Sequence, residues 1–386
     1  MKILGFTGSR ADYFLQRPLF LSLSACKDIE FQLIVSGGIL DETESNTLSY
    51  IQNEPFKILA CMHIPDLNST SHLNSISHLL LELPEVISDF SPSICLVYAD
   101  RYESFAFAQA CFHLNKVIMH IEAGDLTYGG TFDDSIRHSI SHMAHLYSVT
   151  TSSSFKVLQS FGIHPSRIHH TGLLSYDNLS SLELTSARDL LSELNLNPNM
   201  PLILATYHPI PRDPERTKFE SKNFFQALVS ASEFSNIIIT SPNHDDGREI
   251  ILDEIKQITH LPNIVYINSL GAKRYYSLMS YSTSVPVVVA GNSSSIIKEA
   301  PFFNAHSLNV GDRQAGRTSA SSQVNVCAEH ILILKKLEML CTKSCSAPSN
   351  PYFKENPSLN LRDFIINALN TMSHDELISN QLFKSE

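Results

Sequence analysis

Four carboxylates lie within about a dozen residues in the middle of the chain, between two histidines. They are Glu122, Asp125, Asp133 and Asp134, and Arg137 follows closely. Like charges that are held together repel one another and shift each other's pKa values, so a fold gains little from such crowding unless proton transfer or leaving-group control requires it. The segment therefore predicts acid–base catalysis.

The same segment lies at the C-terminal end of a predicted strand, where the active-site residues of α/β proteins are usually found. Residues 116–121 (KVIMHI) predict a buried strand, and Glu122 marks its C-terminal end. A helix is predicted to begin near Thr131, which resembles a capping box together with Asp134 three residues later. Because the first turn of a helix favours negative charge, capping is the role expected of Asp134.

An acidic and a basic side chain lie one turn apart on the flank of this helix. Asp133 and Arg137 are an i, i+4 pair beside the apolar face, so Arg137 is expected to orient Asp133. His138, His142 and His145 follow on the opposite face, with spacings that could in principle hold zinc. No carboxylate or cysteine on that stripe completes a metal site, so we expect a solvated or subunit-contact face and no metal.

Short β-rich runs alternate with helical stretches throughout the chain, which predicts an α/β fold with parallel sheets. Polar or glycine-rich loops follow the predicted strands at residues 8–12, 37–38, 100–101 and 122 in the first half, and at 208, 242–245, 291–294 and 311–313 in the second. Open α/β sheets bind ligands outside the carboxyl ends of their strands. Two such halves are therefore expected to face each other across a cleft.

The length of 386 residues exceeds one ordinary hydrophobic core and predicts two domains. We expect the first over residues 1–190 and the second over residues 191–357, with the joint in the proline-containing stretch 190–201. An amphipathic stretch at 359–372 predicts a final helix. Residues 358–386 are expected to join the first domain.

The composition is that of a globular, cytoplasmic protein. Apolar residues make up 43%, no apolar run approaches the roughly 20 residues that cross a bilayer, and the N-terminus predicts a strand rather than a signal peptide. The net charge of −11 disfavours nucleic acid as a partner. Seven cysteines without framework spacing argue against a disulfide scaffold, and Cys341 and Cys345 are expected to be free thiols in a loop.

The loop that follows the Val-rich run 285–290 is the strongest binding signal. It reads GNSSS at residues 291–295 and opens a helical stretch, so backbone N–H groups and serine hydroxyls predict a phosphate site. The alternative is that the serines only cap the helix. Glu299, about a turn later, could accept hydrogen bonds from ribose hydroxyls, although the sequence alone favours a surface glutamate.

Arginines at predicted strand ends supply the positive charge that a diphosphate needs. Arg313 and Arg317 share a loop with two glycines, and Arg10 and Arg101 follow strands in the first half. Guanidinium groups are always charged and can bind phosphate bidentately, so a diphosphate could be neutralised without a metal. His208 ends a strand just before a proline, a position that predicts a ligand contact. No P-loop sequence occurs, which argues against a P-loop NTPase.

Taken together, these segments resemble a known family. The matching motifs are GSRADY at 8–13, Asp100-Arg101, HIEAGD at 120–125, DDSIRH at 133–138, YHP at 207–209, SPNHDDG at 241–247, GNSSS at 291–295, EAP at 299–301 and GDRQAGR at 311–317. They are similar to those of the hydrolysing UDP-N-acetylglucosamine 2-epimerases of sialic acid biosynthesis, over roughly residues 1–320. The resemblance implies the glycosyltransferase-B architecture, in which two Rossmann-like domains hold the nucleotide sugar in their cleft.

By this resemblance Glu122 and Asp133 are the acid–base pair and Asp100 steers the C2 or C3 region of the sugar, with the order of proton transfer open. The substrate-binding set comprises Arg10, Arg101, Arg137, His208, Asn243, Ser293, Ser294, Glu299 and Arg313, with Glu299 on the ribose. The implied reaction removes the C2 proton and expels UDP to give a 2-acetamidoglucal, to which water adds to yield N-acetylmannosamine. It needs no external cofactor, and the implied assembly is a homodimer.

Two departures from the family pattern leave the substrate open. Ile296 stands where the family usually has glycine, and residues 128–130 lengthen the spacing between Glu122 and Asp133. Related enzymes of legionaminic acid synthesis act on a UDP-2,4-diacetamido-2,4,6-trideoxyhexose, whose 4-position needs different room. A non-hydrolysing epimerase, a glycosyltransferase of the same architecture and a non-catalytic nucleotide-sugar sensor are further alternatives. The clustered carboxylates favour an epimerase over a glycosyltransferase.

Overall fold

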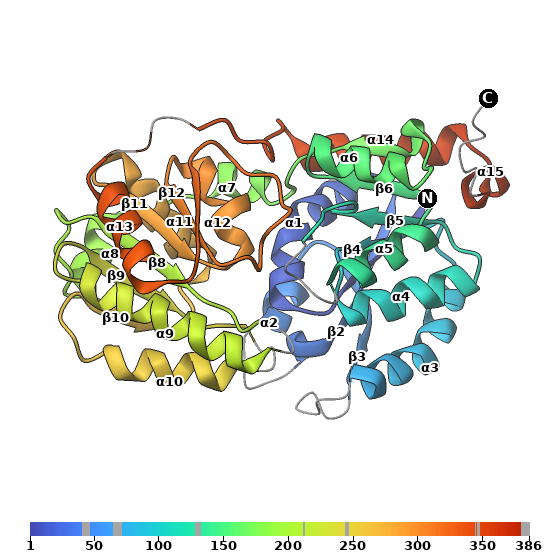
Figure 1. Cartoon of the computed structure of the whole chain (residues 1–386). Coiled ribbons are helices and arrows are strands. Elements are labelled where there is room, and N and C mark those ends of the chain that lie inside the picture. The colour runs from blue at the N-terminus through green and yellow to red at the C-terminus, as the bar shows by residue number, and fades with distance from the viewer. Residues whose placement is uncertain are drawn as a thin grey trace. The chain divides into compact units, whose positions relative to one another are not determined.

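The chain folds into two compact units (Figure 1). The computed structural model describes residues 1–40, 47–64, 72–127, 133–210, 213–243, 247–343, 345 and 348–379. The first unit is Met1–Asp125, Phe132–Ser181 and Tyr352–Glu386, and the second is Leu126–Thr131 and Leu182–Pro351. Each unit has its own sheet, its own hydrophobic core and its own set of polar strand ends.

The division between the units falls at Ser181/Leu182, ahead of the stretch 190–201 where the sequence predicts it. The reason is local packing. Helix α8 (Ala187–Glu193) packs against α11 (Gly271–Ser280) within the second unit. The segment before α8 also contacts α11, because the Thr185 N–H donates to the Ser277 hydroxyl at 3.0 Å.

The first unit contains a parallel seven-stranded sheet in the order β3-β2-β1-β4-β5-β6-β7 among its described residues. Its strands are β1 (Lys2–Thr7), β2 (Glu30–Ser36), β3 (Lys57–Met62), β4 (Ile94–Tyr98), β5 (Ile118–Ile121), β6 (Leu146–Val149) and β7 (Ile168–His170). Its helices are α1 (Arg10–Ser24), α2 (Thr47–Gln52), α3 (His72–Phe90), α4 (Tyr102–His113), α5 (Asp133–Met143), α6 (Ser152–Ser160), α7 (Tyr176–Ser181), α14 (Pro357–Thr371) and α15 (His374–Ile378). The strand order reverses at β1 and β4, and such a switch point is where doubly wound sheets bind ligands.

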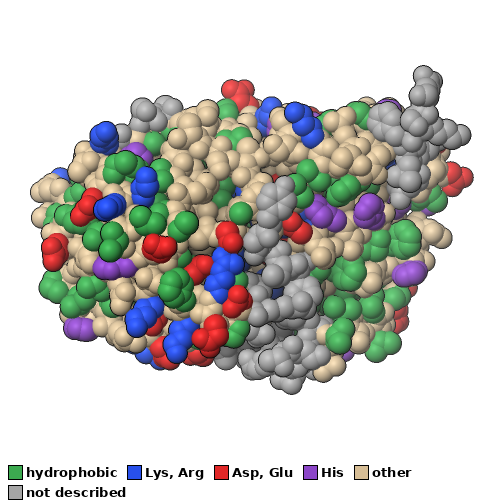
Figure 2. Space-filling view, in the orientation of Figure 1, with side chains coloured by type: hydrophobic (Ala, Val, Ile, Leu, Met, Phe, Trp, Pro, Cys, Tyr) green, Lys and Arg blue, Asp and Glu red, His purple; other side chains and the backbone are tan. Residues whose placement is uncertain are grey.

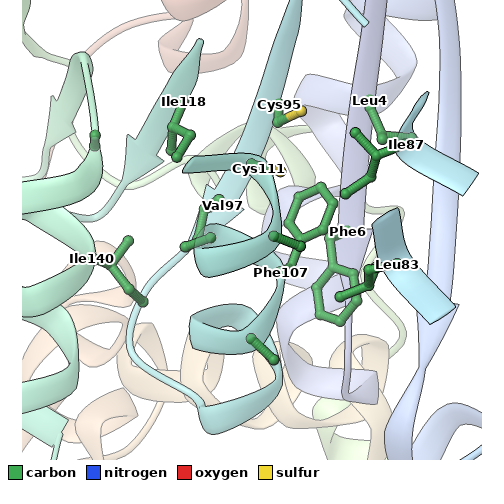
Figure 3. Close-up of a cluster of buried hydrophobic side chains, with 14 of the residues drawn as sticks. Leu4, Phe6, Leu83, Ile87, Cys95, Val97, Phe107, Cys111, Ile118 and Ile140 are labelled. Carbon is green, nitrogen blue, oxygen red and sulfur yellow. The ribbon is translucent and has the colours of Figure 1, made fainter. Parts of the chain in front are cut away.

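Apolar side chains cover both faces of this sheet, as a parallel sheet requires. Leu4 and Phe6 of β1 belong to one buried cluster, and Ile3 belongs to the other. Figure 3 shows the first cluster, in which the rings of Phe6 and Phe107 stack with centroids 4.8 Å apart. Side chains of α3 and α4 complete this cluster, while α1 and α14 complete the other.

The last two helices return to the first unit. Helix α14 packs on α1, and the Ser358 N–H donates to Asp177 at 2.9 Å. At the C-terminal end of α15, the buried Arg167 guanidinium donates to the carbonyl oxygens of Leu377 and Ser379 at 2.7 and 2.9 Å. These hydrogen bonds satisfy carbonyl groups at the end of the helix, where intrahelical donors run out.

The second unit contains a parallel six-stranded sheet in the order β10-β9-β8-β11-β12-β13 among its described residues. Its strands are β8 (Leu202–Thr206), β9 (Asn236–Thr240), β10 (Ile264–Ile267), β11 (Val287–Gly291), β12 (His306–Val310) and β13 (Gln323–Val326). Besides α8 and α11, its helices are α9 (Pro214–Ala231), α10 (Arg248–Ile258), α12 (Ser294–Lys298) and α13 (His330–Cys341). The predicted α/β class with parallel sheets in two units is confirmed. Cys341 lies buried at the end of α13 rather than in a loop.

The surface carries both signs of charge. On the face drawn in Figure 2, the coloured basic side chains lie among acidic ones. Among the described residues of that face, basic side chains therefore form no continuous track that would bind a phosphate backbone. Among the described residues, none of the helices combines the length and hydrophobicity needed to span a membrane.

Gly291 at the end of β11 is a position where the fold requires glycine. Its φ is +131°, and a Cβ there would lie 1.9 Å from the Thr206 carbonyl oxygen on the neighbouring strand. We expect Gly291→Ala to destabilise the protein by at least about 2 kcal/mol in urea unfolding. Gly38→Ala is the control, because a Cβ at Gly38 meets nothing within 4 Å. Equal stability of the two variants would contradict the constraint at Gly291.

Candidate active site

The first unit places two acids at the ends of neighbouring strands. Asp100 follows β4 after Ala99, Glu122 follows β5 directly, and β4 pairs with β5 in the sheet. Ala99 and Glu122 have φ angles of 52° and 59°, which cost free energy in residues that carry a side chain. Strain of this kind collects at functional sites. Both strand ends are therefore candidates for the chemistry.

A buried arginine joins these acids to α5. The Arg137 side chain is 2% exposed and donates to a carboxylate oxygen of Asp100 and to Asp134 at 2.5 Å. It also donates to the backbone carbonyl of Asp125 at 2.9 Å. A buried guanidinium keeps its charge, so it requires such partners to offset the loss of water. Arg137 thus holds Asp100 against the helix whose first residue is Asp133.

Two predictions for α5 concern residues in these contacts. Arg137, predicted to bind substrate and to orient Asp133, is buried in ion pairs with Asp100 and Asp134. Asp134, predicted to cap the helix, also accepts a hydrogen bond from Arg137, one turn along the helix. The proposed capping partner Thr131 and the inserted residues 128–130 lie outside the described residues. Asp133 begins α5 and is exposed.

Glu122 is buried and has a tyrosine partner on the neighbouring strand. The Tyr98 hydroxyl hydrogen-bonds Glu122, and burial followed by this carboxylate raises the pKa of Tyr98 well above its usual range. Tyr98 therefore stays protonated and can only donate to the carboxylate. Sequence inspection misses Tyr98 because it reads as one more buried residue of β4.

His120 links the two strand ends to α5. One ring nitrogen, Nε2, lies 2.8 Å from the Ala99 carbonyl oxygen, and Nδ1 lies 2.9 Å from the Ser141 hydroxyl of α5. A carbonyl oxygen can only accept, so the neutral ring carries its proton on Nε2 and accepts from Ser141 at Nδ1. Burial, assisted by the charge of Arg137, lowers the pKa of His120 to about 4. The ring is therefore neutral near pH 7 and fixes the turn that precedes Asp100.

Asp125 has a structural position within the acid-rich segment. Its carboxylate accepts hydrogen bonds from the hydroxyls of Ser154 and Thr150 at 2.6 and 3.2 Å. It is buried, and its backbone carbonyl accepts from Arg137. Of the four crowded acids, Asp125 therefore stabilises the loop after β5.

A further carboxylate lies at the start of α1, close to the predicted ligand arginines of this unit. Asp12 is buried, and its Oδ2 lies 3.7 Å from Nε of Arg101, which also pairs with Glu103 at 3.2 Å. Burial outweighs the effect of Arg101 and raises the pKa of Asp12 to about 6. The motif GSRADY contains this residue, but only the fold reveals its burial. Arg10, two residues earlier, is exposed.

The predicted histidine stripe does not form. Helix α5 ends at Met143, so His145 lies beyond it and is buried, with its Nδ1 accepting the Ile118 N–H at 3.0 Å. His138 and His142 contact the ring of Phe161, with centroids 5.1 and 5.2 Å apart. The helical periodicity used for the prediction fails here because the helix stops two residues before His145.

The second unit gathers neutral polar groups at the ends of β8, β9 and β11. His208 accepts the Asn243 N–H at its Nδ1 at 3.0 Å, so its proton resides on Nε2. The Asn292 side chain bonds both the N–H and the carbonyl of His208. Burial, with the charge of Arg313, lowers the pKa of His208 to about 3. The predicted residues His208 and Asn243 are thereby brought together, while His244 and Asp245 lie outside the described residues.

The serine loop after β11 forms a short capped helix. Ser293 is the N-cap of α12, and its hydroxyl accepts the Ser295 N–H at 3.4 Å. Ser294 begins the helix, and Glu299 is the C-cap residue that follows it. Glu299 is partly buried and hydrogen-bonded to the hydroxyl of Tyr276. Ile296, the departure from the family pattern, is fully buried and fills the core beneath the loop.

Arg313 completes the polar end of this sheet. It follows β12 and donates to the backbone carbonyl of Asn292 at 3.2 Å. Gln314 beside it is buried and donates to the same carbonyl at 3.1 Å. Behind the loop, Arg216 joins Glu220 at 2.7 Å and also pairs with Asp312. The loop after β12 thus places the Arg313 guanidinium next to the serine loop, and this arrangement is suited to binding an anion.

Comparisons with known proteins identify the family of the chain. A family model described as UDP-N-acetylglucosamine 2-epimerase matches residues 22–365. A Legionella pneumophila protein named "UDP-N,N'-diacetylbacillosamine 2-epimerase (hydrolyzing)" is 32% identical over 91% of this chain and 92% of its own length. The polysialic acid biosynthesis protein P7 of Escherichia coli is 31% identical over 94% of both chains. A Neisseria meningitidis UDP-GlcNAc 2-epimerase, solved with UDP-GlcNAc, superposes with a TM-score of 0.79 at 21% identity over 95% of this chain and all of its own.

The buried histidines predict a loss of stability in acid. His120, His145 and His208 have pKa values lowered from 6.5 to about 4, 4 and 3, so the unfolded state binds more protons than the folded state between pH 6.5 and 4. Stability is present above pH 6.5 and is lost as the pH falls through this window, by up to about 1.4 kcal/mol per pH unit for each histidine. The pKa of Asp12, raised to about 6, makes this one group increase stability on acidification, which offsets only part of the loss from the three histidines.

Thermal unfolding between pH 7 and 4 measures this dependence. The melting temperature should fall on acidification, and His120→Gln, which removes one titrating group while keeping a donor and an acceptor, should show a shallower fall. If the melting temperature of the variant falls with pH as steeply as that of the wild-type protein, His120 is not held neutral in the folded state.

Proposed function

The chain belongs to the UDP-N-acetylglucosamine 2-epimerase family, and we propose that it is a hydrolysing 2-epimerase of a UDP-activated 2-acetamido sugar. Its products are UDP and the free sugar with inverted configuration at C2. The single observation that carries this proposal is the placing of Asp100 and Glu122 at the ends of the neighbouring strands β4 and β5, with Asp100 paired to the buried Arg137. Transfer to an acceptor needs chiefly one base and does not account for these two acids.

The proposed reaction has two steps. In the first, a carboxylate removes the C2 proton, the C–H electrons form the C1–C2 double bond, and the C1–O bond breaks to release UDP. In the second, water adds to C1 of the resulting 2-acetamidoglucal while a carboxylic acid returns a proton to C2 from the opposite face. The first step needs a base on one face of the ring and the second needs an acid on the other face, and two carboxylates supply both.

We assign Glu122 and Asp133 as the acid–base pair. Glu122 is buried beside the Tyr98 hydroxyl, which fixes its orientation, and Asp133 begins the helix that Arg137 ties to Asp100. Asp100, held by Arg137, steers the C2 and C3 region of the sugar. Positioned groups of this kind typically contribute about 100- to 10,000-fold each to the rate.

The second unit is proposed to bind the nucleotide. Arg313 and the serine loop supply positive charge and donors for the diphosphate, and the neutral His208 ring presents its Nε2–H as one more donor. Donors fixed before the reaction stabilise the charge that grows on UDP as it departs. The remaining proposed nucleotide contacts of this unit are Asn243, Ser293, Ser294 and Glu299, with Glu299 on the ribose. Arg10 and Arg101 are the proposed nucleotide contacts from the first unit.

Two substrates follow from these arguments. UDP-N-acetylglucosamine, giving N-acetylmannosamine for sialic acid-type synthesis, is the first candidate. The name of the Legionella relative favours a UDP-2,4-diacetamido-2,4,6-trideoxyglucose, the substrate class of legionaminic acid synthesis, as the second. The two sugars differ at C4 and C6, so the C2 chemistry described above applies equally to both.

Turnover in deuterated water tests the proposal. The purified protein is incubated with each UDP-sugar in turn, and the products are followed by NMR. We expect UDP together with a free, C2-deuterated 2-epimer of one of the two sugars, because the proton returned to C2 comes from solvent. A UDP-linked epimer would contradict hydrolysis, and transfer to an acceptor without C2 exchange would indicate a glycosyltransferase.

Glu122→Gln provides the matched variant for this experiment. It should lower kcat at least about 100-fold and leave the affinity for UDP within about threefold, since the lost group acts on the sugar. Glu82→Gln is the control, because Glu82 is an exposed carboxylate of the same unit. A fully active Glu122→Gln would remove Glu122 from the mechanism.

A further inference from the structure

Asn292 is fully buried at the point where β11 ends, and its side chain bonds the main chain of the neighbouring loop. Its Oδ1 accepts the His208 N–H at 2.6 Å, and its Nδ2 donates to the His208 carbonyl at 2.8 Å. The assignment of oxygen and nitrogen follows from the partners, because exchanging them would set donor against donor and acceptor against acceptor.

These two bonds extend the sheet beyond its last paired residues. Strands β8 and β11 pair in register from Val287 with Leu202 to Gly291 with Thr206. One residue further along β11, the Asn292 amide meets the main chain of His208 with one donor and one acceptor, as a peptide group of the strand would. The loop after β8 is thereby fixed although the regular ladder has ended.

The main chain of Asn292 connects two further residues to the same point. Its carbonyl oxygen accepts hydrogen bonds from Arg313 and Gln314, which follow β12. His208 in turn accepts the N–H of Asn243, which follows β9. One buried asparagine therefore links the loops that follow four strands of this sheet, and each of these loops carries a proposed nucleotide-binding residue.

We propose that Asn292 is a positioning residue that sets His208 and Arg313 in the geometry that binds UDP. The ligand named here rests on the proposed function, whereas the positioning itself does not. Asn292 acts through the His208 main chain, so removing its side-chain amide leaves a buried N–H and a buried carbonyl without partners. Such groups relax toward other partners, and the His208 ring moves with them.

Asn292→Leu, of nearly the same volume, removes both bonds and keeps the packing. Calorimetric titration with UDP should show an affinity at least about tenfold weaker than that of the wild-type protein. Asn292→Ser, which is too short to reach both partners, should also weaken UDP binding and replaces the leucine variant if that variant does not fold.

Asn236→Leu is the matched control. Asn236 is equally buried in the same sheet, and its amide bonds Asn197 O at 2.6 Å, at the end where β9 begins. Its loss should lower stability but leave UDP affinity unchanged.

A double-mutant cycle separates positioning from a general loss of stability. If Asn292 acts through His208, adding Asn292→Leu to His208→Ala should weaken UDP binding by much less than it does in the wild-type background. Strictly additive effects, or equal losses of affinity in the Asn292 and Asn236 variants, would overturn the proposal.

Hydrogen exchange of the unliganded protein tests the positioning without reference to any ligand. The main-chain N–H groups of His208 and Asn243 should exchange at least about tenfold faster in Asn292→Leu than in the wild-type protein, while those of β9 should not change. Unchanged exchange at both sites would overturn the positioning role. Faster exchange in a protein that binds no UDP would uphold it and overturn the proposed function instead.

Discussion

The buried charge of Arg137 is the constraint on which the first unit's site depends. A guanidinium that is 2% exposed cannot lose its proton and cannot reach bulk water, so the surrounding chain must supply negative partners. Asp100 and Asp134 provide them, and the Asp125 carbonyl adds a third acceptor. The crowded acids therefore have different partners. The Asp134 carboxylate pairs with Arg137, the Asp125 carboxylate accepts from Ser154 and Thr150, and Glu122 accepts from Tyr98.

The polar loops after the strands are held in place by different interactions in the two units. In the first, ion pairs around Arg137 and the neutral ring of His120 tie the ends of β4 and β5 to α5. In the second, the Asn292 amide performs the corresponding task without any formal charge. A neutral support suits the diphosphate site proposed for the second unit, because fixed carboxylates would repel that anion, whereas the proton transfer proposed for the first unit requires carboxylates.

Much of this arrangement follows from local sequence, and the remainder depends on contacts that local sequence does not specify. The sequence predicts the alternation of strands and helices, the polar strand ends and the capped serine loop 293–295, because each depends on residues that are neighbours in the chain. It does not predict the partner of Arg137, since Asp100 lies 37 residues earlier in the chain. The burial of Asp12 and the role of Asn292 likewise depend on strands that become neighbours only in the folded sheet.

If Arg137 positions the carboxylates assigned to proton transfer and does not itself bind the nucleotide, Arg137→Gln should separate turnover from binding. UDP affinity and sugar turnover are measured side by side for this variant, with folding checked by circular dichroism. Turnover is expected to fall at least about 100-fold while UDP affinity stays within about threefold. Normal turnover of the bound sugar together with a lost affinity for UDP would show that Arg137 binds the nucleotide instead.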